Sequence, residues 1–357
     1  MSPVLRTLVV DDTVTWRKLV SDAVGSFGDV ELIGTAPHGE LAIRRLRSSP
    51  VDLVFCDVHM PRLDGVETLR IIRREFPKTV VVMMSGISTR NAESTIKALQ
   101  MGAAGFIRKP DGTSAEENRR RLAADVEKML RVARVKVTMS VTMPAKGLRP
   151  APARTPESRL PPPPRHVAVA AVGVSTGGPE ALSRLVPALP GSLSVPVVCV
   201  QHMPPEFTRS LAESLNRKSA LRVVEAAEGD EVCRGTVYIA PGGRHMTVRL
   251  TDGKRRIGIN DGPPENSCKP SVDVLFRSVA HAYGDKGILA VVLTGMGGDG
   301  ASGVRAMKRK GCFCITQSAD SCVVYGMPRA VDEAGMSDIS LPIEEIAPRI
   351  VRTTNRA

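Results

Sequence analysis

A serine follows an apolar run in a glycine-rich turn, Gly173-Val174-Ser175-Thr176-Gly177-Gly178. The run from Val167 to Val172 predicts a buried strand, and Pro179-Glu180-Ala181-Leu182 predicts the start of a helix. A serine at such a turn lies close to the free amides of the helix start, which stabilise negative charge. The turn can therefore supply a nucleophile and part of an oxyanion site. Taken alone, the same pattern also fits a serine that only caps the helix.

Two further apolar runs end in residues that could activate this serine. A serine becomes nucleophilic at neutral pH when a histidine accepts its proton and a carboxylate orients the histidine. His202 stands at the end of the run Val195 to Val200, and Asp299 lies in the glycine-rich turn after the run Ile288 to Leu293. Parallel strands bring their carboxyl ends to one edge of a sheet, so we expect Ser175, His202 and Asp299 to meet there. A purely structural role for the histidine stays open at this point.

The chain order of these three residues differs from that of the α/β-hydrolases. Gly173-x-Ser175-x-Gly177 fits the nucleophile turn of those enzymes, but their order is serine, acid, histidine. That order would require Asp252 or Asp261 followed by His281, and none of these stands at a predicted strand end. The chain order therefore argues against the α/β-hydrolase fold.

A dinucleotide-binding site is a second alternative. Gly295-x-Gly297-x-x-Gly300 follows a strand and precedes a helix, with Asp320 at a suitable distance. However, Asp299 inside this turn would repel a pyrophosphate, and only 57 residues follow Gly300. We therefore expect no nucleotide cofactor.

The first 110 residues show a separate set of polar strand ends. Five short apolar runs alternate with helical patterns, which predicts a parallel sheet. Clustered carboxylates repel one another unless a cation joins them, and Mg²⁺ prefers such oxygen ligands. With the metal bound, one carboxylate can accept a phosphoryl group whose oxygens a hydroxyl and a lysine then hold. The residues at these strand ends are Asp11, Asp12, Asp57, Ser85 and Lys109. Each alone would be an ordinary turn residue or surface charge.

Residues 1–125 resemble a response regulator receiver domain. The resemblance rests on those strand ends, on Asp57-Val58-His59-Met60-Pro61-Arg62-Leu63-Asp64-Gly65 and on Lys109-Pro110. It implies a flavodoxin-like fold with a five-stranded parallel sheet, phosphorylation of Asp57, and switch roles for Ser85 and Lys109. It also implies Mg²⁺ bound by Asp11, Asp12, Asp57 and the backbone carbonyl of His59. The family usually has Asn, Glu or another small polar residue in place of His59.

The C-terminal motifs resemble those of the chemotaxis protein-glutamate methylesterase and glutamine deamidase family, in which a receiver precedes an esterase domain. By this resemblance Ser175 is the nucleophile, His202 the base and Asp299 the acid, with backbone amides around Thr176 and Met296 as oxyanion donors and no cofactor for the esterase reaction. The motifs are Gly173 to Gly178, Gln201-His202-Met203-Pro204-Pro205, Tyr238 to Met246, Pro270 to Phe276 and Leu293 to Ala301.

The family implies a phosphorylation-activated serine esterase. It would hydrolyse glutamate γ-methyl esters on the cytoplasmic helices of methyl-accepting chemoreceptors, deamidate receptor glutamines, and receive its phosphoryl group from a sensor histidine kinase. In the simplest mechanism the unphosphorylated receiver obstructs the Ser175 rim, the edge of the sheet where Ser175, His202 and Asp299 are expected to meet. The alternative is a receiver fused to a degenerate effector that only binds a partner; a receiver-linked DNA-binding regulator is a third possibility.

Composition divides the chain into three parts. We expect a receiver at 1–125, a helix and Pro/Arg-rich linker at 126–165, and at 166–357 a doubly wound, mainly parallel α/β esterase domain with an antiparallel insertion. Residues 131–165 hold eight Lys and Arg against one Asp or Glu, so most of the net charge of +12 lies outside the domains. With one Trp and three Tyr as well, the sequence predicts no nucleic-acid partner.

Location is predicted from what the sequence lacks. No apolar run approaches the roughly 20 residues that span a bilayer, and the N-terminus does not resemble a signal peptide. The seven cysteines are scattered, which is typical of a reducing compartment. We therefore expect a cytoplasmic protein that does not insert into the membrane.

Overall fold

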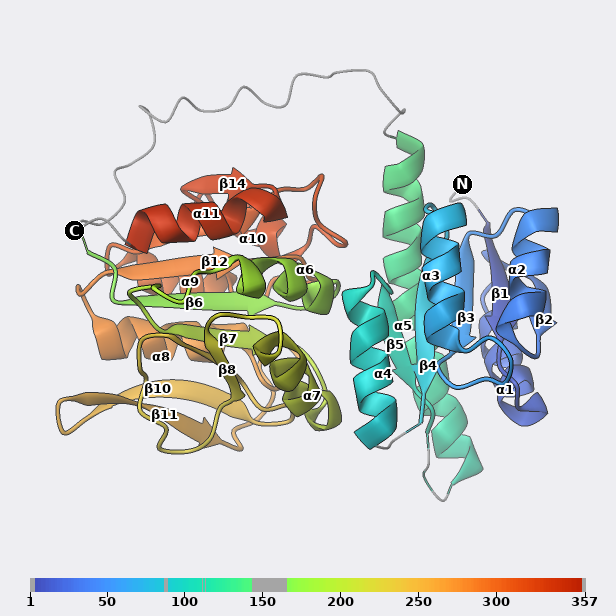
Figure 1. Cartoon of the computed structure of the whole chain (residues 1–357), viewed down its shortest axis with the longest axis horizontal. Coiled ribbons are helices and arrows are strands. Elements are labelled where there is room, and N and C mark those ends of the chain that lie inside the picture. The colour runs from blue at the N-terminus through green and yellow to red at the C-terminus, as the bar shows by residue number, and fades with distance from the viewer. Residues whose placement is uncertain (1–3, 87–88, 111, 113, 143–165, 355–357) are drawn as a thin grey trace. The chain divides into compact units, whose positions relative to one another are not determined.

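The computed structural model describes residues 4–86, 89–110, 112, 114–142 and 166–354. The chain divides into two compact units, Met1–Gly147 and Leu148–Ala357, each with its own sheet (Figure 1). The Pro/Arg-rich part of the predicted linker, from 143 to 165, lies outside the described residues. No helix among the described residues is both long and apolar enough to cross a membrane.

The N-terminal unit is built on the five-stranded parallel sheet that the sequence predicts. Its strand order is β2-β1-β3-β4-β5. Strands β3 and β4 lie inside the sheet and are buried along their whole length, as continuous apolar runs covered on both faces must be. The strands are β1 (Leu5–Val10), β2 (Val30–Ala36), β3 (Leu53–Asp57), β4 (Val80–Ser85) and β5 (Gly105–Arg108).

Helices cover this sheet in two groups: α1 packs against α5, and α3 packs against α2 and α4. They are α1 (Val14–Gly25), α2 (Gly39–Ser48), α3 (Gly65–Glu75), α4 (Thr89–Gln100) and α5 (Ala115–Thr142). The last helix continues beyond residue 125, the predicted end of the receiver, and Val126 and Leu130 are fully buried. The packed part of this unit therefore extends past that boundary.

The C-terminal unit contains a seven-stranded sheet, parallel throughout, in the order β14-β13-β12-β6-β7-β9-β8. This confirms the predicted mainly parallel α/β class. The strands are β6 (Val169–Val174), β7 (Val197–Gln201), β8 (Arg222–Glu225), β9 (Thr236–Ile239), β12 (Ile288–Val292), β13 (Phe313–Gln317) and β14 (Ile339–Leu341).

Strand β6 lies between β7 and β12 at the point where the chain changes direction across the sheet. From β6 the chain proceeds through β7 towards one edge, and later returns through β12 towards the other. In open parallel sheets ligands bind beyond the carboxyl ends of the strands at such a switch point. The fold therefore places the ends of β6, β7 and β12 where a site is expected.

The predicted antiparallel insertion is a hairpin of β10 (His245–Thr251) and β11 (Lys254–Asn260). It packs on helix α8 (Val272–Tyr283), which also contacts β6, so α8 lies between the hairpin and the sheet (Figure 1). Buried side chains from all three, among them Val248, Phe276 and Val292, form one core. The hairpin thus helps to hold the N-terminus of α8 at the sheet.

The remaining helices of this unit are α6 (Gly178–Leu185), α7 (Pro205–Asn216), α9 (Ala301–Lys308), α10 (Met327–Glu333) and α11 (Ile343–Thr354), with a 3-10 turn η2 at Val186–Ala188. Helix α9 begins at Ala301, because the turn that contains Asp299 leads directly into it.

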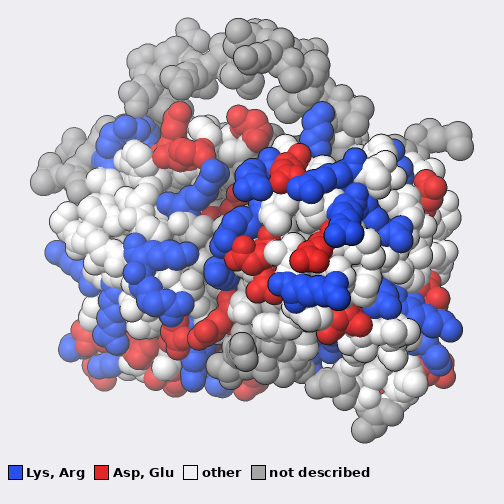
Figure 2. Space-filling view, turned by 45° about the vertical axis from the view of Figure 1, so that its right-hand side comes forward, with Lys and Arg blue, Asp and Glu red and all other residues white. Residues whose placement is uncertain are grey.

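Charged side chains of both signs share the surface. On the face shown in Figure 2, Lys and Arg lie among Asp and Glu and do not form one uniform basic surface. Many of them are paired, as Arg47 is with Glu75 and Arg184 with Glu344. Mixed signs of this kind provide solubility more than a field that steers a polyanion.

Candidate active site

Ser175 is the first residue after β6, and its backbone is held by three hydrogen bonds. Its N–H donates to the carbonyl of Thr294 at 3.0 Å, while its own carbonyl accepts from the N–H of Gly178 at 2.8 Å and from Nε2 of Gln201 at 3.0 Å. A Cβ at position 178 would lie 1.8 Å from Oε1 of Gln201, so glycine there leaves room for the side chain that holds Ser175. The turn is therefore a rigid support for a half-buried serine.

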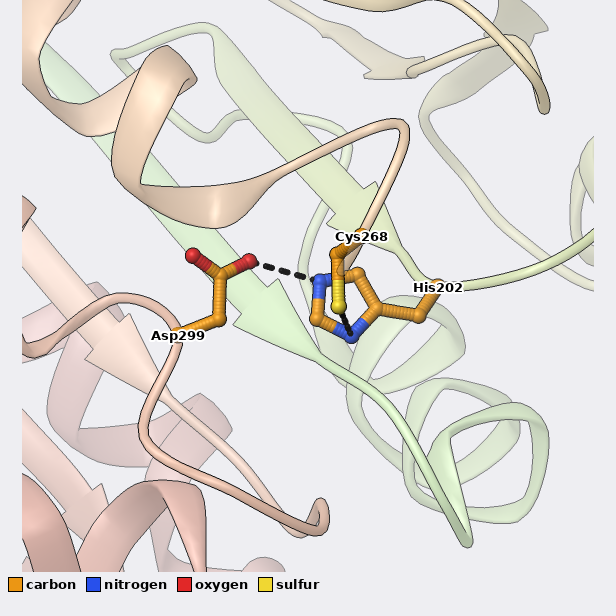
Figure 3. Close-up of side chains that lie close together, drawn as sticks. All are labelled: His202, Cys268 and Asp299. Atoms are coloured by element: carbon orange, nitrogen blue, oxygen red, sulfur yellow. Dashed lines mark hydrogen bonds and ion pairs between the residues drawn. The ribbon is translucent and has the colours of Figure 1, made fainter. Parts of the chain in front are cut away.

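His202 is the first residue after β7, and its ring is largely buried, with 13% of the side chain exposed. Its backbone N–H donates to the carbonyl of Val174 at 3.1 Å, which fixes it beside the end of β6. In the ring, Nε2 lies 2.8 Å from Oδ2 of Asp299 and Nδ1 lies 3.6 Å from Sγ of Cys268 (Figure 3). One ring nitrogen is thus committed to the carboxylate, and Nδ1 is left for other chemistry.

Asp299 is buried in the turn after β12 and accepts hydrogen bonds on both carboxylate oxygens. Its partners come mainly from the start of α8, whose first free amides favour an anion. Oδ2 accepts from His202 and from the N–H of Val272 at 2.7 Å; Oδ1 accepts from Oγ of Ser271 at 2.9 Å, the N–H of Asp273 at 3.2 Å and Nδ2 of Asn266 at 3.0 Å. This carboxylate is therefore fixed in position and in charge.

These contacts shift the pKa of both partners. Burial disfavours the charged form of Asp299, but the bond and charge of His202, with the donors from Asn266 and Val272, hold the pKa of Asp299 well below its usual range. Burial also disfavours a charged His202, yet the hydrogen bond to Asp299, with further contributions from Cys268, raises the pKa of His202 to about 9. The pair is therefore an imidazolium and a carboxylate near neutral pH, and the ring becomes a proton acceptor as the pH rises.

Ser175 and His202 lie on adjacent strands, but their side chains are not bonded. Within the described residues, Oγ of Ser175 makes no hydrogen bond. Gly295 confines this serine from the other side, since a Cβ on that glycine would lie 2.7 Å from Cβ of Ser175. Catalytic hydrogen bonds are often absent before substrate binds. The structure thus joins His202 to Asp299 and places Ser175 on the same rim.

The amides of Thr176 and Met296 are both available as donors. Neither N–H donates to another group in the described structure. Both residues are partly exposed and lie in fixed turns. The carbonyl of Thr176 accepts from Oγ1 of Thr294 at 2.9 Å, and Gly295, next to Met296, is bonded to Val324 and Met327. Two fixed, unused amides beside a serine can stabilise an oxyanion.

The other histidines and aspartates that could have formed a triad with Ser175 lie elsewhere. His245 is fully engaged, because Nε2 bonds to the carbonyl of Pro263 at 2.9 Å and Nδ1 accepts from the N–H of Ser271 at 3.2 Å. His281 is exposed near the end of α8, and Asp261 pairs with Arg244. The serine–acid–histidine order of the α/β-hydrolases is therefore not assembled here.

A second cluster lies at the carboxyl edge of the N-terminal sheet. Asp11, Asp12 and Asp57 each present a carboxylate oxygen within 4.8 Å of the others. Lys109 reaches two of them, with Nζ 2.7 Å from Oδ2 of Asp11 and 2.9 Å from Oδ1 of Asp57. Burial raises the pKa of Asp57 to about 6, although Lys109 opposes this shift. One lysine does not balance three carboxylates, so the donor set suits a divalent cation.

The other predicted receiver residues surround this cluster. Ser85 is buried at the end of β4, and its Oγ donates to the carbonyl of Gly86 at 3.1 Å. His59 is exposed two residues after Asp57. Gly65 allows the backbone to approach closely, since a Cβ there would lie 2.0 Å from the carbonyl oxygen of Asp57. The acceptor loop is thus packed directly under α3.

Sequence reasoning missed four side chains around the C-terminal site: Asn266, Cys268, Asp273 and the amide of Gln201. Asp273 carried a signal, because it follows the helix N-cap Ser271, whose Oγ accepts from the N–H of Val274. Asn266 and Cys268 carried none, since they lie in a loop far in sequence from Ser175, His202 and Asp299.

Comparison with known proteins identifies a family for each of the two units. A family model described as CheB methylesterase matches residues 170–350, and one described as response regulator receiver domain matches residues 7–117. A protein of Desulfotalea psychrophila named protein-glutamate methylesterase/protein-glutamine glutaminase is 39% identical over 360 residues, 98% of either chain. One of the same name from a Nocardioides species is 41% identical over 361 residues, 99% of this chain and 96% of that protein.

A solved structure gives the same result for the C-terminal unit. The CheB methylesterase catalytic domain of Thermotoga maritima is 40% identical and superimposes with a TM-score of 0.51, covering 52% of this chain and 98% of its own. The chain therefore belongs to the CheB methylesterase family, carboxylic ester hydrolases that here carry a response regulator receiver domain at the N-terminus.

Proposed function

We propose that this enzyme hydrolyses glutamate γ-methyl esters on the helices of chemoreceptors in sensory adaptation, and that it deamidates receptor glutamines by the same acyl chemistry. The observation that carries the proposal is the bond of His202 to a fixed, buried Asp299 on the rim that also presents Ser175. The names of the full-length relatives support both the ester and the amide substrate.

In the proposed reaction, Oγ of Ser175 attacks the ester carbonyl while Nδ1 of His202 accepts its proton. Asp299 stabilises the imidazolium that forms. The tetrahedral oxyanion receives hydrogen bonds from the amides of Thr176 and Met296. Its collapse expels methanol, protonated by His202, and leaves an acyl group on Ser175. Water, deprotonated by the same nitrogen, then releases the glutamate; with a glutamine substrate the leaving group is ammonia.

We also propose that the N-terminal domain controls this reaction through phosphorylation of Asp57 by a sensor histidine kinase. Asp11, Asp12, Asp57 and the carbonyl of His59 would hold Mg²⁺, which neutralises the carboxylates and holds phosphoryl oxygens during transfer. Lys109, already at Asp57, would pair with the phosphoryl group. Phosphorylation would relieve obstruction of the Ser175 rim and raise esterase activity.

A methanol-release assay on methylated receptor tests the catalytic proposal. The Ser175→Ala variant is expected to lose at least about 10³-fold in kcat, because it removes the nucleophile. Ser183→Ala is the matched control: Ser183 lies in α6, where its Oγ donates to no group but the carbonyl of Glu180 among the described residues, and the rate of this variant should remain that of the wild type. Substantial methanol release by Ser175→Ala would refute the nucleophile assignment, whereas no release by the wild-type protein would favour the degenerate, partner-binding alternative.

The regulatory proposal has its own test on the full chain. A small-molecule phosphodonor with Mg²⁺ should raise the rate of the wild-type protein and leave Asp57→Asn unchanged. Equal stimulation of both proteins would exclude Asp57 as the control point.

A further inference from the structure

The thiol of Cys268 lies beside the catalytic ring without a role in the proposed reaction. Its Sγ is 3.6 Å from Nδ1 of His202, while Asp299 occupies the opposite nitrogen at 2.8 Å (Figure 3). The three side chains each present a potential metal-ligating atom, and these atoms lie within 4.8 Å of one another. Cys268 is partly exposed, so solutes reach it from solvent.

The loop that carries this cysteine is fixed at several points. Glu265 and Cys268 exchange backbone hydrogen bonds of 3.1 and 2.8 Å, and Glu265 forms a two-pronged ion pair with Arg277 of α8, with Nη1 2.6 Å from Oε1. Between them, Asn266 and Ser267 have φ angles of 53° and 61°, which reverse the chain so that Asn266 bonds to Asp299 and the thiol faces His202. The thiol and the imidazole are therefore held together before any ligand arrives.

The distance between Sγ of Cys268 and Nδ1 of His202 fits two ligands of one metal ion. Zinc binds a cysteine sulfur at about 2.3 Å and a histidine nitrogen at about 2.0–2.1 Å, so two such ligands at a tetrahedral angle lie about 3.6 Å apart. This matches the Sγ to Nδ1 distance of 3.6 Å. Metal-bound histidines usually donate their other N–H to a carboxylate, which fixes the ring. Asp299 already does this.

The other cysteines offer no comparable arrangement in the described structure. Cys56, Cys199, Cys312 and Cys314 are buried, and burial raises the pKa of each thiol well above its usual value. Cys233 is exposed and Cys322 is partly exposed, but neither belongs to a group of three ligating residues found among the described residues.

We propose that Cys268 and His202 form a binding site for a thiophilic divalent cation of the Zn²⁺ class. Sγ of Cys268 and Nδ1 of His202 are the protein ligands, Asp299 orients the ring, and water fills the remaining positions. Bound metal blocks Nδ1, so the nitrogen cannot accept the proton of Ser175 and the esterase is inhibited. This inhibition rests on the function proposed above, whereas binding of the metal does not.

Cobalt tests the binding without any assay of activity. Co²⁺ added to the full-length protein in excess Mg²⁺ should produce the ultraviolet absorption of a thiolate-to-cobalt charge transfer, which the carboxylate cluster of the receiver cannot give. Cys268→Ser should lose this band and Cys233→Ser should retain it. Absence of the band from the wild-type protein, or its persistence in Cys268→Ser, would overturn the site.

Inhibition is tested with Zn²⁺ in the methanol-release assay, without a phosphodonor and with each variant compared with its own metal-free rate. Zn²⁺ should inhibit the wild type and Cys233→Ser reversibly, and a chelator should restore the rate. Cys268→Ser should need at least about 10–100-fold more Zn²⁺, the loss that even an outer partner of a metal ligand causes. A cobalt band without zinc inhibition would overturn the inhibitory role and leave the site, whereas an inactive metal-free wild type would instead point to failure of the proposed function.

Discussion

Replacement of Asp299 by asparagine removes the charge that holds His202. Each carboxylate oxygen accepts at least two donors, namely Nε2 of His202 and the N–H of Val272 on Oδ2, and Ser271, Asp273 and Asn266 on Oδ1. An amide has one acceptor oxygen, so its NH₂ group must face one of these two sets of donors. With the oxygen kept on the side with three donors, the NH₂ meets Nε2 of His202 and forces the ring into the tautomer with hydrogen on Nδ1.

That tautomer cannot accept the proton of Ser175, so we expect kcat to fall by about 10⁴-fold, the cost of the same change in a Ser-His-Asp triad. KM should change little, because Asp299 is buried behind the ring and does not face the substrate. In the wild type, kcat/KM should rise with pH through about 9, where His202 loses its proton. Without the anion, the hydrogen bond and charge that raise the pKa of His202 are lost, so this pKa falls and the residual activity should reach its plateau at lower pH.

The substitution should also lower the free energy of unfolding by about 3–5 kcal/mol, because it breaks a buried ion pair and leaves donors without an acceptor. Methanol release across pH and urea unfolding provide the measurements. Asp273→Asn is the matched control, since Asp273 is equally buried but bonds to Gly300, Gly303 and Asn266 and does not touch His202.

Asp273→Asn should cost about 1–3 kcal/mol of stability and leave the pH profile in place. If Asp299→Asn retained a third of the wild-type kcat, or if both variants shifted the pH profile alike, the argument that this carboxylate sets the tautomer and charge of His202 would be refuted.

Three further results are expected. Gly178→Ala should lower kcat in the methanol assay by about 10²-fold, because its Cβ would displace the Gln201 side chain that holds Ser175. Gly298→Ala is its control, since a Cβ there would meet only Ala330, at 3.5 Å. Lys109→Met should abolish stimulation by phosphodonor, because it removes the cation at Asp57. The free energy of unfolding should fall as pH rises from about 6.5 through about 9, since the folded pKa of His202 is raised and its contribution is complete only below the unfolded value; His202→Asn should lack this slope in urea titrations.

The parts of the fold that the sequence predicted are those where local pattern and tertiary role agree. Continuous apolar runs such as β3 and β12 must be buried on both faces, so the pattern predicts strands inside a parallel sheet. The turn after each strand then collects polar residues at one edge of the sheet. That rule is sufficient to bring Ser175, His202 and Asp299 to one rim, because each of them follows one of three adjacent strands.

The parts that the sequence did not predict depend on contacts made elsewhere in the chain. Strands β8 and β14 have only four and three residues and lie at the two edges of the sheet. Strand β11 begins Lys254-Arg255-Arg256, so only its second half shows an apolar pattern, and its pairing with β10 defines it. In the same way, nothing near Cys268 in sequence indicates that its loop folds back onto His202.

The two nitrogens of the His202 ring differ in how firmly their bonding partners are fixed. Nε2 faces a carboxylate with five donors at the start of a helix, so the orientation and charge of that side are fixed by the core of the domain. Nδ1 faces a half-buried thiol at 3.6 Å, and the neighbouring strand β6 is followed by Ser175, whose side chain makes no hydrogen bond among the described residues. Of the two ring nitrogens, Nδ1 is therefore the one that a ligand can occupy without displacing Asp299. Because the proposed proton transfer and the proposed metal site use this same nitrogen, occupancy of one excludes the other, and the thiol of Cys268 decides how strongly a metal competes with the substrate.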